Sequence, residues 1–200
     1  MKVAISGSHC TGKTTLVRHL SKKLTFTTVP ELAQEICDLA GVHPLQDLDR
    51  YAYYIFECAL GYSTYYLHKT TPNFIADRSI YDVIAYIKVM KPGTTREREY
   101  VCNKLLELAK EINYDLIIFL RFPSCYSFKL SDESYNLARQ VDITLADLFK
   151  NCPYRVEEVY EYLYERDFDK VYKMIAQLSV TGDVFDPHID IDEELEKSLK

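Results

Sequence analysis

The 200-residue chain lacks tryptophan and has no run of the roughly 18 consecutive apolar residues that a membrane-spanning helix requires. It also lacks an excess of positive charge, since 24 lysines and arginines stand against 30 aspartates and glutamates, for a net charge of −6. Proteins that bind nucleic acids or membrane surfaces usually present a basic face. We therefore expect no membrane partner and no general nucleic-acid partner. The N-terminus runs straight into a structural motif, so we expect no signal peptide.

The cysteines do not follow the spacing of a metal site or a disulfide framework. There are six, and none belongs to a C-x-x-C pair. Thiols scattered along a chain of this length favour free cysteines in a reducing compartment. We therefore expect a cytoplasmic protein with free thiols at Cys10, Cys37, Cys58, Cys102, Cys125 and Cys152.

The composition is that of an ordinary globular domain, with 48% hydrophobic and 27% charged residues. The length predicts one domain with a substantial core. Regular patterning fades near the C-terminus, where acidic residues accumulate. We therefore predict a domain over residues 1–178 and an acidic tail over residues 179–200.

Short apolar runs alternate with longer segments of helical periodicity. The runs predict strands over residues 2–6, 24–29, 73–76, 114–120 and 154–159. Apolar residues spaced by three and four predict helices that include residues 16–24, 80–87, 101–112, 137–148 and 168–175. Strands without polar alternation, each followed by an amphipathic helix, indicate a parallel sheet covered on both faces. The sequence therefore predicts a three-layer α/β fold with about five mainly parallel strands.

The stretch from Gly7 to Thr14 matches the pattern G-x-x-x-x-G-K-[ST] and lies between a predicted strand and a predicted helix. The glycines let backbone N–H groups point at a phosphate, and the helix N-terminus adds its positive dipole end. Lys13 is expected to contact the β- and γ-phosphates, and Thr14 to bind Mg²⁺. The motif predicts a P-loop NTPase fold with ATP and Mg²⁺ as cofactors. The expected nucleotide-binding residues are Gly7, Ser8, His9, Cys10, Thr11, Gly12, Lys13, Thr14 and Thr15.

Other P-loop classes carry further motifs that are missing here. An AAA+ or ABC-type motor usually has an Asp-Glu pair after its Walker B strand, and an ABC protein also has an LSGGQ-like signature. A GTPase usually has Asn-Lys-x-Asp, whereas Asn103-Lys104 is followed by two leucines inside a predicted helix. These absences favour a small-molecule kinase.

Three polar residues follow predicted strands and are expected at the sheet edge where open α/β folds bind ligands. Glu31 follows the second strand, and Asp77 and Arg78 follow the third. We expect Asp77 to hold Mg²⁺ and Arg78 to reach a phosphate or the acceptor. Two alternatives stay open: Glu31 is an acid in the first turn of a helix that Pro30 begins, or Asp77 is an N-cap.

A polar loop after the fourth strand predicts a lid over about residues 121–136. Its cation Lys129, together with Arg139 on the following helix, is expected to neutralise the transferred phosphoryl group, although Arg139 is equally well explained as a solvated helix residue. An aromatic-rich segment from residue 50 supplies the acceptor candidates Arg50 and Tyr54, with a core stripe as the alternative.

The motifs SGSHCTGKTTL, VPELAQEI, NFIADRSIYD and YDLIIFLR, in this order, resemble those of P-loop nucleoside and nucleotide kinases. The layout is most similar to NadR-like AAA domains, which include a ribosylnicotinamide kinase, and Asp-Arg-Ser resembles the element of thymidylate and deoxynucleoside kinases. The resemblance covers about residues 1–178. It implies a five-stranded parallel sheet, a mobile lid and an acceptor pocket. It also implies that Glu31 is a general base or metal-shell residue, Asp77 a metal-shell acid and Arg78 an acceptor-side arginine.

Two positions depart from the NadR-like pattern. Gln34 stands where these domains often have arginine, and the lid offers Lys129 in place of Asp-Gly-x-Arg. We expect ATP-dependent phosphoryl transfer to a nucleoside-like or nucleotide acceptor. The alternatives are a nucleotide-dependent regulatory binding protein and, less favoured by the charge, a kinase of nucleic-acid ends. The sequence leaves a homodimer open.

Overall fold

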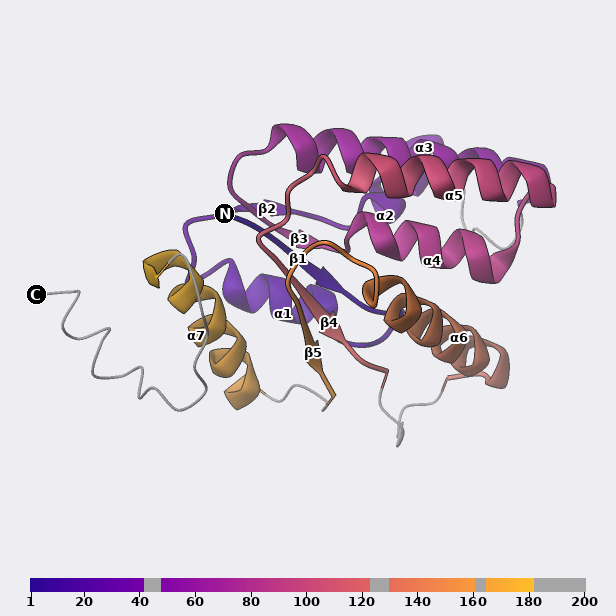
Figure 1. Cartoon of the computed structure of the whole chain (residues 1–200). Coiled ribbons are helices and arrows are strands. Elements are labelled where there is room, and N and C mark those ends of the chain that lie inside the picture. The colour runs from indigo at the N-terminus through magenta and orange to yellow at the C-terminus, as the bar shows by residue number, and fades with distance from the viewer. Residues whose placement is uncertain (42–47, 123–129, 161–164, 182–200) are drawn as a thin grey trace, which may run out of the picture. The chain divides into compact units, whose positions relative to one another are not determined.

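The structure is a computed structural model that describes residues 1–41, 48–122, 130–160 and 165–181 (Figure 1). Residues up to Tyr162 form one compact unit, and the chain from Leu163 belongs to a second. The strands are β1 (Lys2–Ser6), β2 (Thr27–Val29), β3 (Phe74–Asp77), β4 (Leu116–Leu120) and β5 (Val156–Val159). The helices are α1 (Lys13–Leu20), α2 (Leu32–Ala40), α3 (Arg50–Thr70), α4 (Ile80–Met90), α5 (Thr95–Ala109), α6 (Asp132–Phe149) and α7 (Glu165–Thr181).

The five strands form one parallel sheet in the order β2-β3-β1-β4-β5. The central strands are buried along almost their whole length, as expected for strands covered on both faces. In the first unit, α3, α4, α5 and α6 pack together over one face, and α1 covers the other (Figure 1). The predicted α/β fold with a five-stranded parallel sheet is therefore confirmed.

The second strand is shorter than predicted. We expected it over residues 24–29, but β2 begins at Thr27. The N–H of Leu24 donates to the carbonyl of Leu20, so the chain continues as a turn from α1 before it enters the sheet. β2 is also an edge strand that pairs only with β3, which limits its length.

The end of α4 and the start of α5 coincide with helix-breaking and helix-capping residues in the sequence. α4 ends before Pro92-Gly93, where Lys91 adopts a left-handed conformation and Gly93 follows with a φ of 63°. A capping box of Thr94 and Glu97 stands at the start of α5, and each side chain bonds the other residue's backbone N–H.

The predicted C-terminal helix and tail are described only in part. α7 includes the predicted helical residues 168–175 and reaches Thr181, so residues 179–181 of the predicted tail are helical. The rest of the tail, residues 182–200, lies outside the described residues. Within the described part, no helix combines the length and apolar composition needed to cross a membrane.

Candidate active site

Three strand ends meet at one edge of the sheet, and each is followed by a segment singled out in the sequence. β3 lies between β2 and β1, so Val29 is beside Ala76, and Ile5 is beside Asp77. The segment after β3 is therefore flanked by the loop after β1 and by the segment after β2. In parallel sheets this carboxyl edge is where ligands bind.

The loop after β1 requires glycine at two positions for different reasons. Gly7 has a φ of 151°, and a Cβ atom there would lie 2.6 Å from the carbonyl oxygen of Leu120. Gly12 has a φ of 88° with open space around a Cβ, so the backbone angle alone favours glycine. Helix α1 begins at the next residue. The loop and this helix N-terminus together form the arrangement that binds phosphate groups in P-loop proteins.

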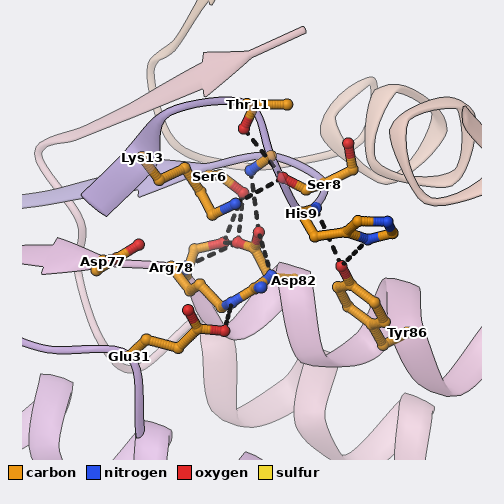
Figure 2. A network of polar contacts seen from close by, with 12 residues as sticks. Ser6, Ser8, His9, Thr11, Lys13, Glu31, Asp77, Arg78, Asp82 and Tyr86 are labelled. Atoms are coloured by element: carbon orange, nitrogen blue, oxygen red, sulfur yellow. Dashed lines mark hydrogen bonds and ion pairs between the residues drawn. The ribbon is translucent and has the colours of Figure 1, made fainter. Parts of the chain in front are cut away.

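Lys13 is buried, with 5% of its surface exposed, and folds back onto the loop (Figure 2). Its Nζ donates to the carbonyl oxygen of Ser8 at 2.6 Å, and the Thr11 hydroxyl donates to the same oxygen. Burial lowers the pKa of Lys13 to about 8, and the charge of Arg78 acts in the same direction. The lysine is thus held within the loop, where a phosphate oxygen can take the place of the Ser8 carbonyl.

Thr14 and Asp77 form a hydroxyl–carboxyl pair at the start of α1. The Thr14 Oγ1 donates to Asp77 Oδ2 at 2.6 Å. Asp77 is 4% exposed, and its Oδ1 is buried without a hydrogen-bond partner in the described structure. Burial raises the pKa of Asp77, although the Thr14 hydrogen bond and the charge of Lys13 oppose that shift. A hydroxyl and a carboxylate oxygen of this kind fit Mg²⁺, which takes its remaining ligands from water and phosphate.

Glu31 follows the end of β2 and Arg78 the end of the neighbouring strand β3, and their side chains form an ion pair (Figure 2). Arg78 Nε donates to Glu31 Oε1 at 2.6 Å. The guanidinium lies over the ring of Tyr86, with the Arg78 Cζ 5.1 Å from the ring centroid. Arg78 has a φ of 95°, unusual for a side-chain-bearing residue, and its N–H donates to the carbonyl of Ile5. α2 begins at Leu32, so Glu31 occupies the N-cap position, but its side chain makes no capping bond.

Asp82 is a site residue that we did not identify from the sequence. It is completely buried in α4, and its carboxyl accepts hydrogen bonds from the Gly7 N–H, the Ser6 hydroxyl and both donors of Ser79. The N-cap of α4 is Ser79, so the alternative of Asp77 as the N-cap is wrong. The sequence feature that could have identified Asp82 is the Ser-x-x-Asp capping box at the start of a largely apolar helix.

His9 links the loop to two helices. Its Nε2 lies 2.9 Å from the carbonyl oxygen of Ser134 in the first turn of α6, and its Nδ1 lies 3.0 Å from the hydroxyl of Tyr86 in α4. A carbonyl only accepts, so Nε2 carries the proton and Nδ1 accepts from Tyr86. Burial lowers the pKa of His9, which agrees with this neutral form.

A cavity of about 280 Å³ adjoins these groups. Glu31, Arg78 and His9 line it on one side. Helix α3 contributes Tyr53, Phe56, Glu57 and Leu60, which share one helix face because they are three and four residues apart.

The acceptor candidates Arg50 and Tyr54 are not among the residues that line this cavity. Arg50 donates to the carbonyl of Lys91, and Tyr54 lies against Tyr51 and Gly93. The cavity faces Tyr53 of the same helix and not its neighbour Tyr54, and the acceptor-binding roles expected for Arg50 and Tyr54 remain predictions.

The predicted lid is described only in part. Residues 123–129, including Lys129, lie outside the described residues, and residues 132–136 are the first turn of α6. Arg121 makes ion pairs with Asp142 at 2.9 Å and Glu158 at 2.8 Å. Arg139 is exposed on α6, and Gln34 bonds Asp38 within α2.

Of the thiols, Cys37, Cys58, Cys102 and Cys152 are free, as predicted.

The fold and the loop between β1 and α1 define a P-loop NTPase class of protein. The chain belongs to the AAA domain family, whose model matches residues 2–166. No curated protein sequence is similar enough to count as a match.

Several solved structures share the fold at low sequence identity. Thymidylate kinase from Candida albicans is 18% identical with a TM-score of 0.59, over 88% of this chain and 91% of that one. Deoxyadenosine kinase from M. mycoides, solved with dCMP and dCDP, is 17% identical with a TM-score of 0.65, over 89% and 100%. NadR protein in complex with NAD and AMP-PNP is 17% identical with a TM-score of 0.64, over 92% of this chain but 50% of that one.

Proposed function

We propose that the protein transfers a phosphoryl group from ATP to a nucleoside-like or nucleotide acceptor. The observation that carries this proposal is the Glu31–Arg78 pair, 2.6 Å apart, which lines a cavity beside the phosphate-binding loop. In a pocket beside the phosphate-binding loop, a carboxylate can accept a proton from the acceptor, and a guanidinium can neutralise the negative charge of a phosphate group. The kinases with this fold support the same reading.

Each residue has a separate task in this mechanism. Lys13 exchanges its bond to Ser8 for the β- and γ-phosphates, and the loop N–H groups hold the phosphate chain. The acceptor enters the cavity with its reacting oxygen near Glu31 and Arg78. Glu31 receives the proton if the acceptor is a hydroxyl, and Arg78 neutralises charge on the phosphoryl group.

Thr14 and Asp77 are the residues that would hold Mg²⁺. The unpartnered Asp77 Oδ1 is the observation that fits the ion. When bound, Mg²⁺ neutralises phosphate charge as it develops. The Thr14 hydroxyl donates to the same carboxyl and keeps it in place.

The acceptor type is decided by two variants. A hydroxyl acceptor needs a base, so Glu31→Gln should lower kcat on the order of a hundredfold or more. A monophosphate acceptor needs none, so Glu31→Gln should have little effect and Arg78→Ala should be the damaging change. The measurement is acceptor-stimulated ADP release from ATP with Mg²⁺ over nucleosides, nucleoside monophosphates and nicotinamide riboside, with Lys13→Ala as the blank. Nucleotide binding without any acceptor-stimulated turnover would reject the kinase proposal in favour of a regulatory nucleotide-binding protein.

A further inference from the structure

Glu57 is a carboxyl group that the proposed transfer reaction does not use. It lies on α3, is 3% exposed and lines the cavity. Its Oε2 is buried and has no hydrogen-bond partner among the described residues. A buried polar atom without a partner reduces the stability of the folded chain. One explanation for such an atom is that a ligand supplies the missing hydrogen-bond donor when it binds.

The neighbours of Glu57 suit a planar ring. Tyr53 and Phe56 line the same part of the cavity from the same helix face, and aromatic side chains stack favourably on flat rings. Glu31 and Arg78 line the same cavity from the strand ends beside the phosphate-binding loop. An acceptor with its reacting oxygen at the Glu31–Arg78 pair therefore extends its ring towards α3.

We propose that Glu57 recognises the acceptor by accepting a hydrogen bond from an N–H group of the acceptor's ring. This inference rests on the proposed function and narrows its substrate class to nucleosides or nucleotides whose ring carries such a donor. An ionised carboxyl has acceptor atoms only, so a ring edge without a donor leaves it unpaired. Sites built to hydrogen-bond one group reject analogues that lack it far more strongly than apolar pockets do.

The protonation of Glu57 supplies a second readout. Burial raises the pKa of Glu57 to about 7, and a hydrogen bond from Tyr53 and the charge of Arg78 oppose the shift. The other titratable groups that line the cavity are His9, Glu31, Asp82 and Tyr86. A ring donor pairs best with the ionised carboxyl, so affinity for donor-bearing rings should rise as pH rises through about 7.

The test is calorimetric binding of two matched ligand pairs: inosine with 1-methylinosine, and thymidine with 3-methylthymidine. In each pair, methylation removes the ring N–H. The wild type should prefer the unmethylated member of at least one pair by about tenfold or more, and the preference should grow with pH. Glu57→Met should remove the preference by taking away the acceptor atoms. Glu57→Gln, which keeps one acceptor oxygen, should remove the pH dependence. Glu99→Gln, the same change at an exposed position of α5, is the control.

Each outcome decides the inference, because binding is measured without turnover. If Glu57→Gln and Glu57→Met both bind every ligand as the wild type does, or lose affinity for both members of each pair equally, Glu57 does not read the ring and the inference is wrong. Nicotinamide riboside, whose ring is positively charged, is titrated in parallel. A dependence on Glu57 confined to this ligand would show recognition of charge and would also overturn the inference. The same ligands are also titrated as their 5′-monophosphates, and failure of every nucleoside and every monophosphate to bind overturns the inference together with the proposed function. Binding with the predicted preference but without phosphoryl transfer overturns the proposed function alone.

Discussion

The carboxyl of Asp82 accepts a hydrogen bond from the backbone N–H of Gly7 at 3.0 Å, although 75 residues separate them in the sequence. The same carboxyl also bonds the Ser6 hydroxyl. The first turn of α4 therefore holds the beginning of the phosphate-binding loop in place (Figure 2). A loop positioned before nucleotide arrives loses less conformational entropy when it binds.

Asp82→Asn should weaken both the fold and nucleotide binding. An asparagine places an amide N–H₂ against groups that already donate, so buried hydrogen bonds are lost at a cost of about 1–3 kcal/mol in the free energy of unfolding. Denaturant unfolding and calorimetric titration with an ATP analogue measure the two effects. Asp147→Asn, the same change at a position 75% exposed on α6, is the control and should change neither. Equal effects of the two substitutions would mean that Asp82 does not organise the loop.

Alanine at the two loop glycines should have unequal effects. Gly12→Ala meets open space and is opposed only by its left-handed backbone, which costs about 1–2 kcal/mol. Gly7→Ala brings a Cβ within 2.6 Å of a carbonyl oxygen on β4, so we expect a loss on the order of 3 kcal/mol. Thermal unfolding without nucleotide compares the two. A larger loss for Gly12→Ala would contradict the assigned contact with Leu120.

The buried His68 should make the protein sensitive to acid. Ile80 donates its N–H to the Tyr114 hydroxyl, which therefore donates its own proton to His68 Nδ1 at 2.7 Å. Burial lowers the pKa of His68 to about 3 from 6.5. Below pH 6.5 the His68 side chain binds a proton in the unfolded chain but not in the folded chain. The free energy of unfolding therefore decreases as the pH falls, by up to about 1.4 kcal/mol per pH unit. His68→Gln keeps an acceptor for Tyr114 but does not titrate, and its unfolding free energy should depend less on pH in this range.

Glu57 should have the opposite effect on stability. Its pKa is raised from 4.5 to about 7 in the folded protein, so the folded chain holds a proton that the unfolded chain releases between these values. The contribution of Glu57 to stability is therefore full below pH 4.5 and is lost as pH rises through about 7. The total loss is about 3 kcal/mol. Denaturant unfolding of the ligand-free protein at several pH values should show a decline that Glu57→Gln removes. An unchanged decline in this variant would assign it to other groups.

Much of the fold was predictable because it depends on local patterns. Buried strands read as continuous apolar runs, and the capping box of Thr94 and Glu97 lies within four residues of sequence. The start of β2 was missed because an edge strand has one partner only, and its length depends on where β3 pairs with it. The roles expected for Lys13, Glu31, Asp77 and Arg78 remain predictions, but the structure places all four at one edge of the sheet.

The sequence by itself determined the class of site, because the phosphate-binding loop is a contiguous motif whose glycines and lysine act through their own backbone and side chains. Only the tertiary structure decided which side chains meet it. Asp82 reaches Gly7, and Glu31 reaches Arg78, through strand order and helix phase. The phase of α3 turns Glu57 rather than Tyr54 into the cavity. Such choices depend on packing between distant segments, and a one-residue rotation of a helix changes which side chain faces a ligand.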